Sequence, residues 1–235
     1  MPWPHFGDRA KPGVIAVAGD GRRFVNEGCP YHDFVPAMRR AARGGPAEAW
    51  LIADATALRR YGLGAVGPWP LPPGRWLRSG YLTRARTIRD LAHAVGLDPD
   101  ALADTVARFN RHAAQGEDPD FGKGADPYSR GNGDPALVPN PCLRALADPP
   151  FYAIRMLPGD IGGLAGLETD AQARVLDLQG RPVPGLYAAG NAAASMCGGA
   201  YAGPGLTIGP AIVFGRIAAL HASRADMSDM AQAEA

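Results

Sequence analysis

One stretch near the carboxyl end, residues 185–222, constrains the fold of this 235-residue chain more than any other. It reads GLYAAGNAAASMCGGAYAGPGLTIGPAIVFGRIAALHA. A short β-prone run stops at Gly190-Asn191, and a loop of small residues then leads into an apolar helix from about Gly205 to His221. The free N–H groups and positive dipole end of such a helix can hold an anion or an electron-rich ring. The stretch predicts a ligand-binding strand-loop-helix element, although an ordinary connection packed for close backbone approach has the same composition.

The ligand expected at this element is uncharged. Tyr201 precedes Gly205 closely enough for a phenol and a backbone N–H to point at one acceptor oxygen. From Gln179 to Val213 the only charged residue is Arg181. A pocket built from this part of the chain is therefore expected to be neutral.

Several segments together resemble a known flavoprotein group. GLYAAGN, AYAGPG and TIGPAIVFGRIAA are similar to the carboxyl-terminal flavin-binding segment of the fumarate reductase/succinate dehydrogenase flavoprotein superfamily. Within that superfamily, DGRRFVNE followed by PYHDF, and NPCL further on, most resemble the 3-ketosteroid Δ1-dehydrogenases. The resemblance implies an FAD-dependent dehydrogenase that acts on a CH–CH group of a steroid-like ring ketone and passes the electrons to an acceptor.

The resemblance also implies catalytic roles for three residues. Tyr201 and the Gly205 N–H match the pair that donates hydrogen bonds to the ketone oxygen, which acidifies the neighbouring C–H. Tyr31 matches the residue that removes the α proton, while the β hydride goes to flavin N5. A free tyrosine has a pKa of about 10, so its surroundings must help it to act as a base near neutrality. A half-buried tyrosine at a turn is the plain alternative for Tyr31.

The same resemblance implies contacts with the cofactor. Asn191 matches a position that meets the ribityl or phosphate region of FAD, and a β-turn role is equally compatible with the sequence. Backbone N–H groups at the helix start would face the N1/C2=O edge of the flavin, where the helix dipole stabilises negative charge. The implied cofactor-binding residues are Gly190, Asn191, Gly205, Leu206, Thr207 and Ile208.

A dicarboxylate is the close competitor as substrate. Superfamily members that reduce fumarate hold its two carboxylates with histidine and arginine, because such a clamp needs fixed charge. Here PGDIGG at 158–163 contains no histidine, and residues 191–205 contain no arginine. A bulky neutral ketone is expected instead of fumarate.

The expected fold is an α+β substrate domain, residues 1–163, followed by residues 164–235 as the carboxyl-terminal part of an α/β, Rossmann-like FAD-binding domain. Superfamily members bind the FAD pyrophosphate at a G-x-G-x-x-G turn between a strand and a helix. The one such pattern here, GLGAVG at 62–67, follows a polar helical run and precedes Pro68, so it is interpreted as a loop. The amino-terminal FAD-binding half is therefore expected to be absent, or supplied separately.

Local signals predict the elements of the first domain. A Gly-Asp-Gly turn at 19–21 favours a hairpin between strands at 14–17 and 22–25. A further strand is expected at Ala49–Ala53. Thr87 and Asp98 have the spacing of N-caps of two helices, the second of which places His112 on one face, as a face residue and not a metal ligand.

Composition excludes other classes of function and leaves two alternatives open. The formal net charge of +1 and the lack of a basic block argue against nucleic-acid binding. Three widely spaced cysteines predict neither a zinc site nor a disulfide scaffold, and no run is long enough to span a membrane, so a reducing cytoplasm is expected. The alternatives are another dehydrogenase of the superfamily, or a truncated fragment that binds no FAD. A weaker further alternative is an interaction partner of another flavoprotein half.

Overall fold

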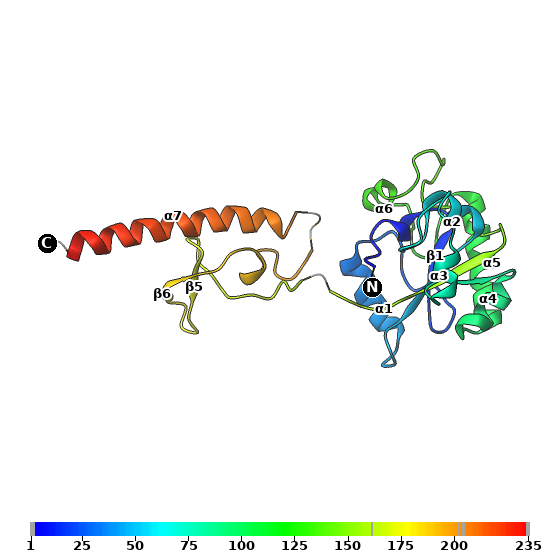
Figure 1. The fold of residues 1–235 in the computed structure, drawn as a ribbon, viewed down its shortest axis with the longest axis horizontal. Coiled ribbons are helices and arrows are strands. Elements are labelled where there is room, and N and C mark those ends of the chain that lie inside the picture. Colours follow the sequence, from blue (N-terminus) through cyan, green and yellow to red (C-terminus); the bar gives the residue numbers. More distant parts are fainter. Residues whose placement is uncertain (1–2, 161, 202, 204, 234–235) are drawn as a thin grey trace. The chain divides into compact units, whose positions relative to one another are not determined.

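The computed structural model describes residues 3–160, 162–201, 203 and 205–233, with side chains as far as residue 224. The chain divides into two compact units, Met1–Gly159 and Asp160–Ala235, and each is described by itself (Figure 1). The predicted functional division into residues 1–163 and 164–235 stays a prediction.

The first unit is built on a four-stranded antiparallel sheet. Its strands are β1 (Val14–Ala18), β2 (Ala49–Ala53), β3 (Thr83–Ala85) and β4 (Phe151–Met156), in the order β1-β2-β4-β3. Successive side chains of a strand point to opposite faces. Val14 and Ala16 accordingly enter one buried cluster, and Ile15 and Val17 enter the other. Both faces of the sheet are therefore covered.

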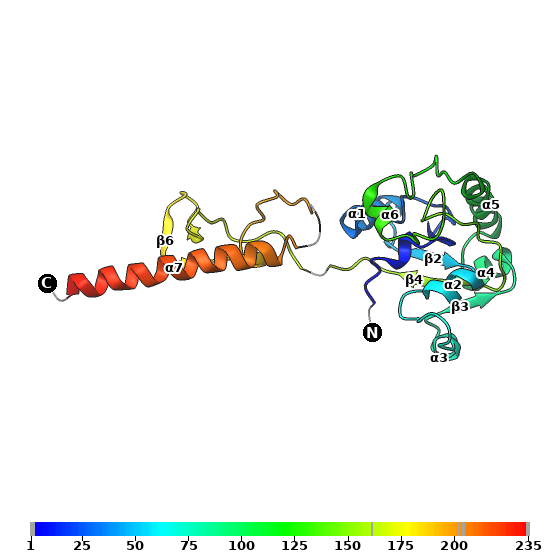
Figure 2. The ribbon, with the colours of Figure 1, turned by 90° about the horizontal axis from the view of Figure 1, so that it is seen from above.

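Helices form the two outer layers of this unit. On the first face lie α1 (Tyr31–Ala41), α2 (Ala55–Tyr61) and the short α3 (Gly74–Arg78). On the second face lie α4 (Ile88–Val95) and α5 (Pro99–Gln115), which pack against each other beside the sheet (Figure 2). The 3-10 helix η1 (Asp8–Ala10) and α6 (Pro127–Gly131) lie in the connecting segments. This arrangement confirms the expected α+β architecture for the first unit.

The predicted helix caps are confirmed. Thr87 accepts a hydrogen bond from the Asp90 N–H at 3.0 Å, and Asp98 accepts from the Ala101 N–H at 3.0 Å. Each side-chain oxygen satisfies a backbone donor that the first turn of a helix leaves without a partner. The predicted strand at Ala49–Ala53 and the loop at GLGAVG are also as expected.

The predicted return strand at 22–25 is wrong. Val14–Ala18 does form a strand, but its only strand partner among the described residues is β2, and residues 22–25 adopt no strand. At the other edge of β1 the turn is closed by the Ala18 N–H, which donates to the Arg22 carbonyl at 2.9 Å. Further along that edge, side chains take over: the Ala16 N–H donates to Glu27 Oε1 at 3.2 Å, and Lys123 Nζ donates to the Val14 carbonyl. These bonds give backbone groups at this edge the partners that a second strand would otherwise supply.

The second unit contains a small hairpin and a long helix. Strand β5 (Arg174–Leu176) pairs with β6 (Pro182–Tyr187), and the 3-10 helix η2 (Gly190–Ala192) follows. Helix α7 (Ile208–Ala233) begins three residues later than expected and continues past His221. The predicted strand-loop-helix order is confirmed. Among the described residues, no helix combines the length and apolar composition needed to cross a membrane.

Candidate functional site

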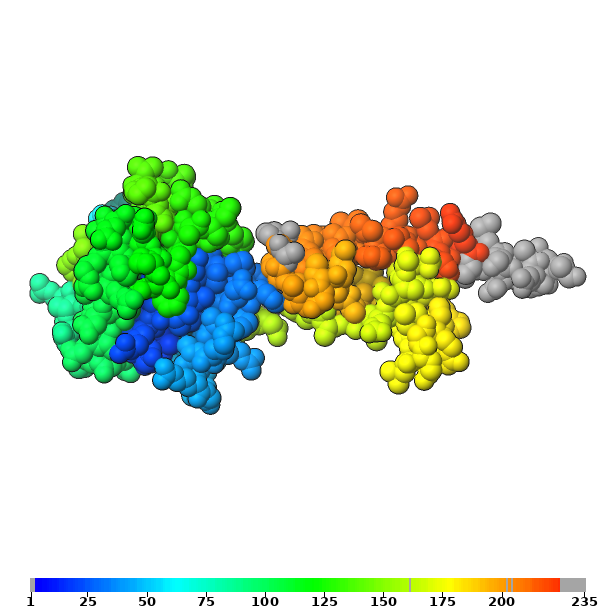
Figure 3. Space-filling view, turned by 180° about the vertical axis from the view of Figure 1, so that it is seen from behind, coloured from blue at the N-terminus to red at the C-terminus, as the bar shows by residue number. Residues whose placement is uncertain are grey.

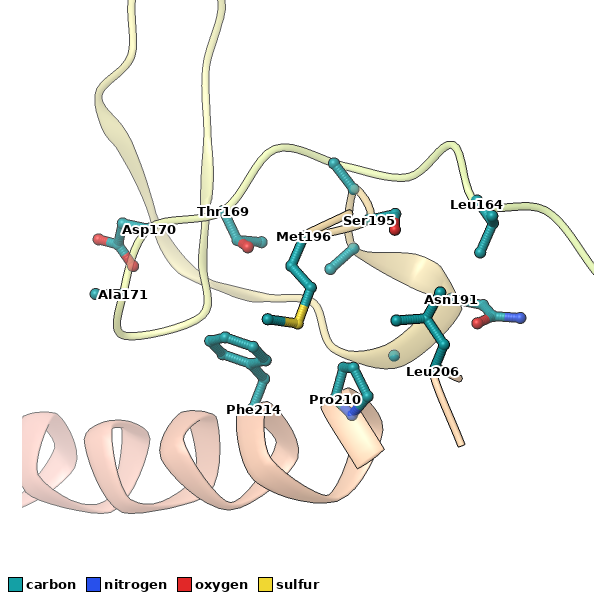
Figure 4. A pocket seen from close by; sticks show the side chains of 13 residues that line it. Leu164, Thr169, Asp170, Ala171, Asn191, Ser195, Met196, Leu206, Pro210 and Phe214 are labelled. Atoms are coloured by element: carbon teal, nitrogen blue, oxygen red, sulfur yellow. The ribbon is translucent and has the colours of Figure 1, made fainter. Parts of the chain in front are cut away.

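A pocket of about 290 Å³ lies within the second unit, between η2, the loop that follows it and the start of α7. Figure 4 shows that Met196 from the loop and Phe214 from α7 point toward one another. The lining residues are small or apolar for the most part. They are Leu164, Thr169, Asp170, Ala171, Gly190, Asn191, Ala193, Ala194, Ser195, Met196, Leu206, Pro210 and Phe214.

Glycine at position 190 permits the close approach of η2 to α7. Gly190 has φ +60°, and a Cβ atom there would lie 2.8 Å from the Cβ of Ala211. On the opposite side, the Leu167 N–H donates to the Ala192 carbonyl at 2.9 Å, and the Ala194 N–H donates to the Leu167 carbonyl at 2.8 Å. These bonds fix the backbone of the pocket wall against the segment around Leu167.

The pocket is effectively neutral. Among the described residues, Asp170 is the one ionisable side chain in the lining, and it accepts hydrogen bonds from Arg174 Nε at 2.7 Å and the Gln172 N–H at 3.0 Å. Burial alone would raise the pKa of Asp170, but the hydrogen bonds from Arg174 and the backbone outweigh it and lower that pKa. Since Arg174 compensates this carboxylate, the expectation of a neutral pocket is met.

The described residues fit the ring end of a flavin. Gly209 N donates to the Gly205 carbonyl at 2.8 Å, so the helical turn at the start of α7 begins beside the pocket. Gly203 and Gly205 have φ of +146° and +94°, and a Cβ at either position would meet no atom of the described part of the chain within 4 Å. A planar, electron-rich ring suits this pocket for three reasons. The walls are apolar, glycines leave room beside the backbone, and the positive end of a long helix lies next to the pocket.

The structure brings some of the predicted residues together. Gly190, Asn191 and Leu206 line the one pocket. Thr207 is exposed and directly precedes Ile208, the first residue of α7, while Tyr201 is half-buried and Gly205 exposed. Tyr31 belongs to the first unit, so its predicted role beside Tyr201 and Gly205 stays a prediction.

Tyr31 is the first residue of α1, where the positive end of the helix favours nearby negative charge. Its half-buried ring lies 5.4 Å from that of Phe6, at an angle of 57°. Phe34 lies three residues after Tyr31, and the guanidinium of Arg9 stacks over its ring, 4.3 Å from the ring centre. Arg9 is 1% exposed and donates to the Glu27 carbonyl at 2.8 Å. The segment leading into Tyr31 is thereby tied to a buried charge cluster.

That cluster consists of Arg23, Glu27, Asp118 and Lys123, and it was not predicted from the sequence. Arg23 donates to both oxygens of Glu27 at 2.6 and 2.8 Å, and to both oxygens of Asp118 at 2.9 and 2.8 Å. Lys123 Nζ lies 3.7 Å from Glu27, and both side chains are fully buried. One signal was present in the sequence: Lys123 is one of two lysines in a chain that otherwise uses arginine.

The two acidic residues near His112 are both paired with arginine side chains. Ligand atoms of His112, Asp118 and Asp120 lie within 4.8 Å of one another. Asp118 is held by Arg23, and Asp120 is paired with Arg108. Both carboxylates already have guanidinium partners, and the expectation that His112 is no metal ligand stays a prediction.

Comparison with known proteins supports the resemblance seen in the sequence. The FAD binding domain family matches residues 4–208. A 3-oxosteroid 1-dehydrogenase of Mycobacterium tuberculosis is 43% identical over 226 residues, which are 94% of this chain and 40% of the relative. A 4-oxocyclohex-2-ene-1-carboxylate 5-dehydrogenase of Sinomonas cyclohexanicum is 42% identical over 214 residues, which are 91% of this chain and 36% of the relative.

A solved structure gives the same result. The crystal structure of 3-ketosteroid Δ1-dehydrogenase from Sterolibacterium denitrificans, in complex with 1,4-androstadiene-3,17-dione, matches with a TM-score of 0.89 at 42% identity. The match covers 95% of this chain and 41% of that chain. This chain thus spans about 40% of the length of the relatives that it matches. With more than half of its residues matched by the family, and with that fold, the chain belongs to the FAD binding domain family of flavoproteins.

Proposed function

We propose that this chain forms the substrate-binding and flavin-facing part of an FAD-dependent dehydrogenase that desaturates the ring of a 3-ketosteroid at the 1,2 position. The observation that carries the proposal is the neutral pocket at the start of α7, lined by Gly190, Asn191 and Leu206. The similarity to 3-oxosteroid 1-dehydrogenases along nearly the whole chain supports the same assignment.

The proposal gives each predicted residue a task. When bound, FAD supplies the acceptor for the β hydride. The Tyr201 hydroxyl and the Gly205 N–H donate hydrogen bonds to the ketone oxygen, where negative charge develops as the α proton leaves. Tyr31 accepts that proton, and the α1 dipole favours the negative charge of its phenolate. Gly190, Asn191, Leu206, Thr207 and Ile208 hold the cofactor.

Two single-atom deletions test these roles. Removing one donor to a developing oxyanion typically costs about 3 kcal/mol of barrier, or about 100-fold in turnover. Tyr201→Phe should therefore lower turnover by about that factor with little change in steroid binding, and Tyr31→Phe should abolish proton removal. Tyr187→Phe is the matched control, because its hydroxyl bonds His221 at 2.8 Å and is not among the pocket's lining residues. Equal losses in all three variants would contradict the assigned roles.

A smaller cyclic ketone is the second candidate substrate, favoured by the Sinomonas relative. That protein's name describes a monocyclic ketone carrying a carboxylate. Among the described residues, the pocket has no basic side chain in its lining to receive a carboxylate, which favours the steroid. Rates with 4-androstene-3,17-dione and with 4-oxocyclohex-2-ene-1-carboxylate, followed by bleaching of the flavin under anaerobic conditions, distinguish the two.

The proposal includes a partner segment that binds the FAD pyrophosphate. Four apolar side chains of α7 are 46–65% exposed, namely Ile208, Ile212, Val213 and Leu220. Exposed apolar surface of this kind is typical of an interface. The chain alone with FAD is the first sample to measure, and the chain with the amino-terminal part of the Sterolibacterium enzyme is the second. A flavin spectrum in neither would support the alternative of an inactive fragment.

We also place the enzyme in the cytoplasm. Cys29, Cys142 and Cys197 are free thiols, and a reducing compartment maintains that state. Recovery of the protein with the cytoplasmic fraction of fractionated cells would support this location. The physiological electron acceptor is expected to be a small oxidant that reoxidises the flavin, and a screen of acceptor dyes and quinones would identify its class.

A further inference from the structure

A second pocket, of about 370 Å³, lies in the first unit, between the turn after β1 and the carboxyl end of α1. Figure 3 shows this side of the molecule, where the dark blue atoms near β1 adjoin the lighter blue atoms of α1. The pocket has an apolar floor and an arginine-rich rim. Ala18, Phe24, Ala37 and Ala41 form the floor, and Asp20, Arg22, Arg23, Arg40 and Arg43 supply the charges.

Three of these arginines form no close ion pair among the described residues, although Arg22 also attracts the Asp98 carboxylate, which lies outside the lining. Arg23 is held by Glu27 and Asp118, as described above. Arg22, Arg40 and Arg43 form no ion pair with any carboxylate of the described residues. Asp20 supplies the one carboxylate that the described residues place in the lining, and its Oδ1 accepts a hydrogen bond from the Arg22 backbone N–H at 3.1 Å. With Arg23 paired, the charged lining residues therefore leave a formal excess of two positive charges on the rim.

Arg43 occupies a position where a glycine would be more stable. It follows the C-cap of α1, Ala42, and has φ +48°. Most helices that end in this way place glycine there, because a Cβ atom is sterically disfavoured in the left-handed region. The next residue, Gly44, has φ +88°. The glycine that usually follows the C-cap therefore stands one position further along the chain, after Arg43. An arginine at a position that disfavours any side chain points to a use for its guanidinium.

From this geometry we infer a binding site for a small organic phosphate, with the phosphate on the arginine rim and an apolar body against the floor. A phosphate monoester carries nearly two negative charges at neutral pH, which matches the excess charge of the rim. Guanidinium groups bind phosphate oxygens through paired N–H donors. Phe24 and the three alanines offer apolar surface to the rest of the ligand. The site is separate from the pocket of the proposed dehydrogenase function, which lies in the other unit.

Calorimetric titration of the whole chain with phenyl phosphate tests the inference. Saturable binding of one equivalent is expected, and the Arg40→Gln/Arg43→Gln double variant should weaken it at least tenfold. The control is Arg59→Gln/Arg78→Gln, which removes the same charge from exposed positions outside the pocket and should bind as the parent does. Inorganic phosphate should bind more weakly than phenyl phosphate, because it makes no use of the floor.

Arg43→Gly separates binding from folding. Glycine relieves the left-handed strain, so this variant should melt at a higher temperature than the parent while binding phenyl phosphate several-fold more weakly. No saturable binding by the parent chain would overturn the inference. So would equal weakening in the control variant, which would indicate only diffuse charge attraction. Equal affinity for inorganic phosphate would refute the organic ligand.

Discussion

Replacing Arg23 with methionine tests the buried charge cluster most directly. Arg23 makes four hydrogen bonds to Glu27 and Asp118, and the side chains of all three residues are at most 4% exposed. Arg23→Met would leave two buried carboxylates with Lys123 as their one nearby cation. Removing one partner of a buried pair costs about 3–5 kcal/mol, mostly because the remaining charge stays uncompensated. With two carboxylates affected, we expect a loss of about 5 kcal/mol in the free energy of unfolding.

A loss of that size is a large share of the stability of a domain, which is typically about 5–15 kcal/mol. For a unit of this length it corresponds to about 10–20 °C in the melting temperature. Urea unfolding followed by tryptophan fluorescence reports the first unit alone, because all four tryptophans of the chain precede residue 160. Arg89→Met is the control, since the Arg89–Asp100 pair is exposed and should contribute nothing measurable.

The dependence on pH gives an independent check. Burial alone would raise the pKa of Glu27 and of Asp118, but Arg23 outweighs it and lowers both below their usual values of 4.5 and 3.8. Carboxylates with lowered pKa values stabilise the folded state above their unfolded pKa, and that contribution is lost as the pH falls through the folded pKa. The difference between parent and Arg23→Met should therefore be largest near neutrality and shrink below about pH 4. A loss under about 1 kcal/mol at pH 7, or a difference independent of pH, would refute the reasoning.

Three further perturbations have defined outcomes. Gly190→Ala should destabilise the second unit and weaken FAD binding, as thermal melts and flavin titration would measure. Gly180→Ala is the control and should have a smaller effect, because Gly180 has a similar φ of +74° but open space around it. Asp54→Ala should cost about 3 kcal/mol in urea unfolding, because Asp54 is a buried N-cap, whereas Asp54→Asn keeps an oxygen for the Ala57 N–H and should lose much less. Burial raises the pKa of Cys29 to about 11, so alkylation by iodoacetamide at pH 8 should be far slower than for a free cysteine, since about one thiol in 1,000 is ionised.

The sequence predicted the elements whose signals are local. The caps at Thr87 and Asp98 act on N–H groups within three residues, so their spacing along the chain is sufficient to identify them. The prediction of a return strand at 22–25 was wrong because the contacts that decide it are distant in the sequence. The groups that complete the edge of β1 include Lys123, which lies 109 residues from its acceptor Val14, and no local pattern reveals such a pairing.

In the candidate site, too, the residues that are close in the sequence could be predicted and those brought together by the fold could not. Gly190, Asn191 and Leu206 surround one pocket because a short loop connects them, and the strand-loop-helix pattern was enough to group them. The arginine pocket of the first unit was not predicted, since its rim combines a turn and a helix end that are adjacent only in the folded chain. The roles of Tyr31, Tyr201 and Gly205 rest on resemblance and stay predictions.

The covered edge of β1 has a consequence for the solubility of the chain. An unpaired strand edge is a template on which a second copy can add a strand, and VIAVA is an uncharged, β-prone sequence. Here the Ala16 N–H and the Val14 carbonyl are already bonded to Glu27 and Lys123. An incoming strand would have to displace two buried charges before it could pair. The cluster thus occupies backbone groups of β1 to which the strand of a second copy would otherwise bond.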